Sequence, residues 1–433
     1  MGLSQATAMV VGTIIGASIF VQASEITRLV PSTKGVYLVW AVAGVLTFFG
    51  ALACAELASA FPQTGGVYTF LKETYSPGVG FLWGWAMFWS MHSGIIAAIA
   101  MIFARYVGYF VPLSDLSLRL VAIGAILLLS GINYVGVKHA STLQALFTLG
   151  KVVAIVAIIL LMVAAGLPTA VTSAPSVAHQ ITLPSFAQAV AAGLFAFGGW
   201  HMVTYTAEET RNPRRTIPLA LMIGTLTVTA CYIALNAVYL HVLPLEQVMS
   251  STRVAADAAE AVVGVRGGAA ISVLVIFSTF GAVAGIILTG PRVYFAMARD
   301  GLLFRWVAAV HPRFRTPHRA IVLQAIWSSA LVATGTYRAI FTRVIYTEWI
   351  FFGLMVLGLI LLRRRASYRP SYRTWGYPIF PALFVLASFF IVVNQIVSDP
   401  RESAIGLGIV ALGLPVYYLW VRPRQVTVNQ ISE

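Results

Sequence analysis

The stretch Val11-Gly-Thr-Ile-Ile-Gly-Ala-Ser-Ile-Phe20 places two glycines inside an apolar segment that is long enough to cross a membrane. A second such segment contains Gly193-Leu-Phe-Ala-Phe-Gly-Gly-Trp200. Because glycine adopts backbone angles that other residues resist, we expect both segments to leave helical geometry. In a bilayer, such a break is tolerated only where it lines a cavity or a ligand. The paired breaks therefore indicate a transporter's substrate site, although glycines that serve close helix packing are the simpler alternative.

The composition around these segments is that of a membrane protein. Of the 433 residues, 59% are hydrophobic and only 10% are charged, whereas about 25% are charged in a typical soluble protein. The mean hydropathy is +0.87. We predict an all-α protein with twelve transmembrane helices at about 5–30, 36–61, 78–112, 118–138, 141–166, 185–207, 217–243, 267–298, 319–336, 340–362, 378–397 and 403–421.

The distribution of positive charge predicts the orientation of the chain. Twelve helices put both termini on one side of the membrane, which we expect to be the cytoplasm. About two thirds of the 28 Lys and Arg residues then fall in cytoplasmic loops, in agreement with the positive-inside rule. The net charge of +14 is therefore expected to face anionic lipid headgroups and not nucleic acid. We expect a multi-pass protein of the cell's inner (plasma) membrane.

The positions of the two breaks divide the chain into repeats within a single transporter domain, 1–433. Counting five helices from each break gives one unit at 1–166 and another at 185–365. Because five is odd, the second unit has the opposite orientation, which is the 5+5 inverted repeat common among secondary transporters. The two helices at 378–421 are additional.

The motifs themselves resemble a known family. Val11–Phe20 is similar to the first-helix motif of the amino acid–polyamine–organocation (APC) superfamily. Gly193–Trp200, with Glu208-Glu209 and Asn212-Pro213 after it, resembles helix 6 of the L-type amino acid transporters (LAT family). The resemblance implies a LeuT-like fold with discontinuous helices 1 and 6, and sodium-independent amino acid transport, usually by exchange. Ala17-Ser18 departs from the Ser-Gly of most relatives, so Ser18 adds bulk or a hydroxyl beside the ligand.

The resemblance also implies how a broken helix binds an amino acid. The helix dipole predicts the same orientation of the bound carboxylate and ammonium groups. Free N–H groups at a new helix start attract the carboxylate, here at Ala17, Ser18 and Ile19. Free carbonyls at a helix end accept from the ammonium group. By resemblance, Phe195 is also a gate that closes over the substrate, whereas an aromatic that fills space between helices is its alternative. The predicted substrate-binding residues are Ile14, Gly16, Ala17, Ser18, Ile19, Phe195, Ala196 and Gly198.

Lys151 is a charge close to the middle of the helix predicted at 141–166. An ammonium there costs about 2.5–3.5 kcal/mol on insertion scales. Relatives carry a lysine at this position, and the resemblance implies that it replaces a sodium ion that would bridge helices 1 and 5. The alternative is a lysine that extends to the cytoplasmic face.

The side-chain pocket is predicted from the same resemblance. His92, Tyr346 and Trp349 match positions that wall it, and ordinary core packing is the alternative for each. Glu348 is expected to face water near the outer surface, or else to attract a basic substrate. Relatives that prefer dibasic amino acids carry an aspartate where this chain has Gly198, so neutral substrates are favoured.

A set of charges lies at the helix ends predicted to be cytoplasmic. They could form an inner gate of ion pairs, although ordinary interfacial charges are the simpler alternative. The residues are Glu56, Glu208, Glu209, Arg211, Arg214 and Arg215.

Other classes of protein fit the sequence less well. The seven histidines are scattered, without a metal-binding or nucleophile motif, so we expect no metal, no cofactor and no enzyme. The lack of a charged pore ring argues against a channel. Proton-coupled or cationic amino acid uptake is the alternative to neutral exchange. Animal relatives bind a glycoprotein partner through a cysteine between helices 3 and 4, but Pro112–Ser117 contains none, so we expect no disulfide-linked partner and a bacterial source.

Overall fold

The structure, a computed structural model, describes residues 1–16, 18–135, 147, 150, 153, 155–160, 181–335 and 337–421. Every regular element in these ranges is a helix, as predicted. In chain order the helices are α1 (Leu3–Ile14), η1 (Ser18–Phe20), α2 (Gln22–Leu29), α3 (Thr33–Ala60), α4 (Val67–Thr74), α5 (Pro77–Ala86), η2 (Met87–Met91), α6 (His92–Val107), α7 (Asp115–Val135), α9 (Leu183–Ala196), η3 (Trp200–Glu209), α10 (Pro213–Val242), α11 (Leu245–Ser250), α12 (Val254–Val263), α13 (Val265–Arg299), η4 (Arg305–Ala308), α14 (His318–Thr334), α15 (Tyr337–Leu362), α16 (Ile379–Ser398), α17 (Pro400–Val416) and η5 (Tyr417–Val421).

Within the described ranges, nine helices are long and apolar enough to cross a membrane, which confirms a multi-pass membrane protein. The predicted count of twelve is not confirmed and stays a prediction. The segment predicted at 5–30 is divided into short helices, the one at 141–166 lies largely outside the described residues, and α14 has only 17 residues. The nine spans are Thr33–Ala60, Pro77–Val107, Asp115–Val135, Leu183–Glu208, Pro213–Val242, Val265–Arg299, Val344–Leu362, Ile379–Ser398 and Pro400–Leu419.

The connector between α10 and α13 contains two short helices, α11 and α12. Gly264, at φ 76°, makes the sharp turn between α12 and α13, because this left-handed region is open to glycine at little cost.

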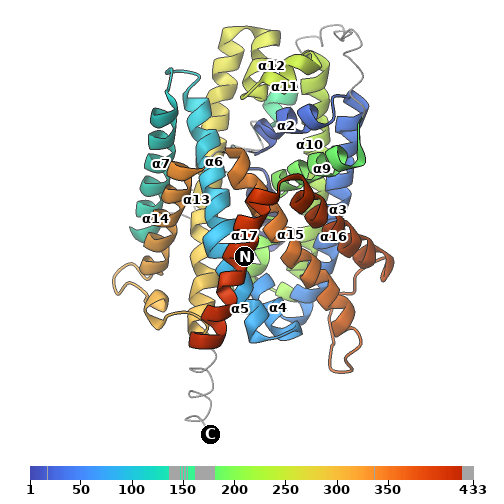
Figure 1. The fold of residues 1–433 in the computed structure, drawn as a ribbon, viewed down its shortest axis with the longest axis vertical. Coiled ribbons are helices and arrows are strands. Elements are labelled where there is room, and N and C mark those ends of the chain that lie inside the picture. The colour runs from blue at the N-terminus through green and yellow to red at the C-terminus, as the bar shows by residue number, and fades with distance from the viewer. Residues whose placement is uncertain are drawn as a thin grey trace.

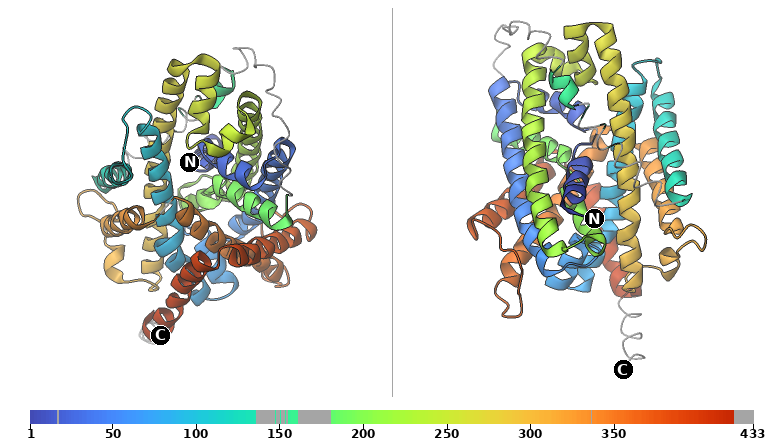
Figure 2. Two further views of the ribbon diagram at one scale, coloured as in Figure 1. Left: turned by 45° about the horizontal axis from the view of Figure 1, so that its top comes forward. Right: turned by 180° about the vertical axis from the view of Figure 1, so that it is seen from behind.

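The helices form a bundle whose length runs vertically in Figure 1. α3 lies along α10, α6 lies along α13, and α7 pairs with α14 at one edge of the bundle (Figure 1). The right-hand view of Figure 2 shows α1 between α10 and α13. Because Ile14, Ile15 and Gly16 are buried there, the first break lies in the interior of the bundle.

Candidate functional site

The first helix ends at the predicted glycine cluster. α1 stops at Ile14, and the chain resumes with η1 at Ser18 and α2 at Gln22. The N–H of Gly16 donates to the carbonyl oxygen of Ile14 at 2.6 Å, a turn much tighter than the α-helical pattern. Within the part of the chain that the structure describes, we find no acceptor for the N–H of Ser18 or Ile19. These two donors are thus available to a ligand.

The second break follows α9. That helix ends at Ala196, a turn follows, and the chain continues as the 3-10 helix η3 from Trp200. Gly199 has φ 97°, and a Cβ atom on it would lie 2.9 Å from the carbonyl oxygen of Thr13. Glycine is therefore required here both by the backbone angle and by the close approach of α1.

Two side chains join the breaks. The Thr13 hydroxyl lies 3.2 Å from the carbonyl oxygen of Gly199. The hydroxyl of Tyr232, on α10, lies 2.9 Å from the carbonyl oxygens of both Ile14 and Ala196, the last residues of α1 and α9. Sequence reasoning missed Tyr232. The only signal was a phenol inside an apolar helix, since a buried tyrosine hydroxyl usually finds a partner.

A small cavity lies beside both breaks. Its volume is about 10 Å³, which is about the room that one water molecule needs. An amino acid therefore requires the surrounding helices to move apart. The cavity is lined by Thr13, Ile14, Gly16, Ser18, Ile95, Ile99, Phe195, Ala196, Gly198, Met202, Ile286 and Glu348.

Most of the predicted substrate-binding residues share this cavity. Ile19 is buried but is not among the lining residues. Ala17 and Lys151 lie outside the described residues. Those that line the cavity are Ile14, Gly16, Ser18, Phe195, Ala196 and Gly198.

The residues predicted for the side-chain pocket do not line this cavity. His92 is buried, and its Nε2 atom lies 2.8 Å from the carbonyl oxygen of Ile286. His92 is thus a hydrogen-bonded core histidine, and its partner Ile286 lines the cavity. Trp200 is also a packing residue, because its ring lies 5.1 Å from that of Phe352.

Tyr346 and Trp349 point toward other helices. The Tyr346 hydroxyl lies 3.1 and 3.0 Å from the carbonyl oxygens of Glu402 and Ser403, and so faces α17. Trp349 stacks on Phe384 of α16 with ring centres 5.1 Å apart. Both side chains thus contact the two C-terminal helices, and the assignment of Tyr346 and Trp349 to the wall of the substrate pocket stays a prediction.

Glu348 does not face water. It stands near the middle of α15, is 7% exposed, and lines the cavity between the two breaks. The expectation of a solvent-facing carboxylate was wrong, because it placed Glu348 near the membrane surface. Glu348 is the one ionisable side chain among the residues that line this cavity.

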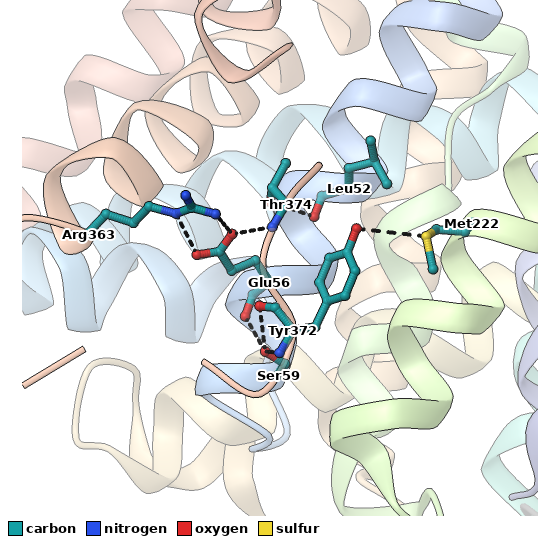
Figure 3. A network of polar contacts seen from close by, with 7 residues as sticks. All are labelled: Leu52, Glu56, Ser59, Met222, Arg363, Tyr372 and Thr374. Atoms are coloured by element: carbon teal, nitrogen blue, oxygen red, sulfur yellow. Dashed lines mark hydrogen bonds and ion pairs between the residues drawn. The ribbon is translucent and has the colours of Figure 1, made fainter. Parts of the chain in front are cut away.

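Glu56, one of the charges predicted for an inner gate, binds Arg363 at the end of α15. Its carboxylate accepts two hydrogen bonds from Arg363, at 2.9 and 2.6 Å, and one from the N–H of Thr374 at 2.7 Å (Figure 3). The hydrogen bond to Glu56 raises the pKa of the Arg363 guanidinium above its usual range. Ser59 and Tyr372 extend the contact between α3 and the segment after α15. Glu56 therefore pairs with Arg363, because the chain after α15 folds back over the end of α3, and an inner gate formed by the other charges stays a prediction.

A second polar cluster was not predicted from the sequence. The Tyr68 hydroxyl and the Lys72 Nζ atom, both on α4, lie 2.6 and 2.8 Å from Oδ2 of Asp300, which follows α13. No sequence motif links these positions, which the fold brings together from distant parts of the chain.

A larger cavity of about 330 Å³ lies between α5, η2, α13, η4 and α14. Aromatic and aliphatic side chains line it, among them Trp85, Trp89, Trp306 and Trp327, without a charged residue. An amino acid zwitterion would lose its hydration there without gaining charged or free backbone partners. The smaller cavity at the breaks is the better candidate for a substrate site.

Comparison with known proteins identifies the family of the chain. Residues 1–418 match the amino acid permease family. The serine/threonine exchanger SteT of Bacillus subtilis (strain 168) is 33% identical over 96% of both chains. The human large neutral amino acids transporter small subunit 2 is 32% identical, over 97% of this chain and 80% of its own. The human cystine/glutamate transporter is 29% identical, over 97% of this chain and 84% of its own.

These relatives are named for different amino acids, so their names do not determine the substrate of this chain. The match over nearly its full length nevertheless confirms the predicted resemblance. The chain belongs to the amino acid permease (APC) family and is an amino acid transporter, not an enzyme.

Proposed function

We propose that this protein is a sodium-independent exchanger of L-amino acids that works by alternating access. The observation that carries the proposal is that two helices end beside one cavity and are joined there through Thr13 and Gly199. The fold we propose is LeuT-like, with twelve helices, inverted repeats at 1–166 and 185–365, and two further helices at 378–421.

The substrate backbone binds at the two breaks in this proposal. Its carboxylate accepts from the N–H groups of Ala17, Ser18 and Ile19, and the free donors of the latter two support this. Its ammonium donates to the carbonyl oxygens of Ile14, Phe195, Ala196 and Gly198. A carbonyl oxygen has two lone pairs, so those that already accept from Tyr232 or a turn N–H retain capacity.

Phe195 acts as the gate in this mechanism. It lines the cavity and is 6% exposed. Since the cavity has room for about one water molecule, the structure corresponds to a closed state, and movement of the Phe195 ring with its helix admits the substrate. Lys151 replaces a sodium ion between helices 1 and 5, and both termini lie in the cytoplasm.

The class of substrate has two candidates. Gly198 carries no carboxylate, which favours neutral amino acids by resemblance to relatives. Glu348 supplies a carboxylate to the same cavity from α15, and this observation favours a basic amino acid instead. We also propose that the chain works without a disulfide-linked glycoprotein partner.

The test is uptake of radiolabelled amino acids into sodium-free proteoliposomes, with each of the twenty amino acids preloaded in turn. We expect an internal substrate to accelerate uptake at least several-fold over empty vesicles. Uptake into empty vesicles that follows an imposed pH gradient would instead establish proton-coupled uptake. Single-channel current steps would contradict both mechanisms.

A further inference from the structure

We propose that Glu348 binds the positive side chain of the substrate, so that this transporter carries basic amino acids of the lysine, ornithine and arginine class. The inference rests on the proposed function, because it assumes that the substrate backbone lies at the two helix breaks. It adds the chemical class of the side chain and the residue that recognises it.

The first support is the position of the carboxylate. Glu348 belongs to α15, which packs against α6 and α9, and it lines the cavity that both breaks share. The backbone groups at the breaks serve the ammonium and carboxylate that every amino acid has. The backbone ammonium and carboxylate of the substrate do not need a carboxylate from a protein side chain. Glu348 therefore remains available to bind the side chain of the substrate.

The second support is the lack of a counter-charge. In the described portion of the chain we find no hydrogen bond or ion pair to the Glu348 carboxylate. An ionised carboxylate buried without a partner is strongly disfavoured, so acidic residues are almost never fully buried unless paired. A cation that arrives with the substrate would offset this cost in the bound state.

The third support is the chemistry of the remaining wall. Ile95 and Ile99 of α6 and Ile286 of α13 are apolar cavity residues. A basic side chain has an apolar stem and a charged head, and such side chains bury the stem against apolar surface while the head finds a polar partner. The isoleucine side chains thus suit the apolar stem of a lysine side chain, and Glu348 suits its ammonium group.

The experiment compares lysine with norleucine, which has the same stem length and no terminal amine. Proteoliposomes are preloaded with the amino acid that accelerates uptake most in the exchange test described under the proposed function. Competition by lysine and by norleucine is then measured for the wild type, Glu348→Gln and Glu348→Asp. Glu246→Gln on α11, an exposed glutamate, is the matched control. Size-exclusion profiles check that each variant folds.

We expect the wild type to prefer lysine to norleucine. Glu348→Gln should weaken lysine competition by about 30-fold, since loss of one member of a buried charge pair costs at least about 2 kcal/mol. Norleucine competition should stay unchanged or improve, Glu348→Asp should keep part of the preference, and Glu246→Gln should behave as wild type.

Three results would overturn the inference. If the wild type exchanges neutral amino acids and lysine does not compete, the inference fails while the proposed function stands. If Glu348→Gln weakens lysine and norleucine equally, Glu348 serves the protein itself, as a proton site or as a partner to a cation of the chain. If no amino acid accelerates uptake, the proposed function itself is wrong.

Discussion

The hydroxyl of Thr13 lies 3.2 Å from the carbonyl oxygen of Gly199, so the end of α1 is held against the turn that follows α9. The contact leaves no room for a side chain, since a Cβ on Gly199 would lie 2.9 Å from the carbonyl oxygen of Thr13. Each break therefore forms part of the wall against which the other packs. A change at either one is expected to disturb both.

Gly199→Ala should push the turn after α9 away from the end of α1. A non-glycine residue in the left-handed region costs about 1–2 kcal/mol, and the new methyl group also collides with the backbone of α1. We expect a lower unfolding temperature in detergent and strongly reduced exchange. Gly124→Ala on α7 is the control, because no atom lies within 4 Å of its Cβ position. Equal behaviour of the two variants would contradict the close packing of the breaks.

Tyr232→Phe should destabilise the site through the loss of one oxygen atom. The single hydroxyl proton lies within reach of the carbonyl oxygens of Ile14 and Ala196. Its loss leaves the accepting oxygen without this donor, and an unsatisfied buried polar group costs about 1–3 kcal/mol. The ring is retained, so its contacts with Trp40 and Phe197 should persist. We expect lower thermal stability and slower exchange.

Tyr239→Phe is the matched control for this variant. Tyr239 lies on the same helix and is buried, but its hydroxyl has no hydrogen-bond partner among the described residues. Removing that hydroxyl should be neutral or slightly stabilising. If both variants lose stability equally, the contacts of Tyr232 with the helix ends are not the cause.

Glu56→Gln should loosen the segment after α15. It removes a carboxylate that is 0% exposed from a pair whose Arg363 side chain is 18% exposed. Breaking a buried pair costs about 3–5 kcal/mol, and the residual exposure of Arg363 places the effect at the lower end. Thermal unfolding measures the loss, with Glu25→Gln as the control, because Glu25 pairs with the more exposed Arg28.

The contribution of the Glu56–Arg363 pair should not vary with pH near neutrality on account of Arg363. The hydrogen bond to Glu56 raises the pKa of the Arg363 guanidinium above its usual range, and a raised pKa stabilises the folded state at every pH below the unfolded value. The stability difference between wild type and Glu56→Gln should therefore be constant between about pH 6 and 9. Unfolding curves at several pH values test this.

Asp300→Asn should weaken the attachment of α4 to the end of α13. The substitution weakens hydrogen bonds from Tyr68 and Lys72 that bind α4 to the end of α13. We expect faster amide hydrogen exchange in Val67–Thr74, measured by mass spectrometry, while the long helices are unchanged. Glu73→Gln is the control, since its pairing with Lys72 at 3.5 Å is more exposed. Protection that is unchanged in Asp300→Asn would show that other contacts hold α4.

The sequence predicted the two breaks because their cause is local. Glycine at Gly16 and Gly199 lets the backbone turn, and the apolar flanks place that turn inside the membrane. Six of the residues predicted around the breaks accordingly share one cavity. The helix count was harder, because a broken or short helix such as α1 or α14 does not reach the usual spanning length.

The direction of each side chain around the site depended on tertiary packing. Glu348 and Trp349 are neighbours in sequence, yet the carboxylate faces the cavity and the indole stacks on α16. Successive helical residues point about 100° apart, so the rotation of α15 decides which of them meets a substrate. α15 packs against α16 and α17 as well as α6 and α9, and Arg363 at its end is bound to Glu56. The sequence by itself determined where the main chain opens, whereas only the assembled helices decided which side chains surround the opening.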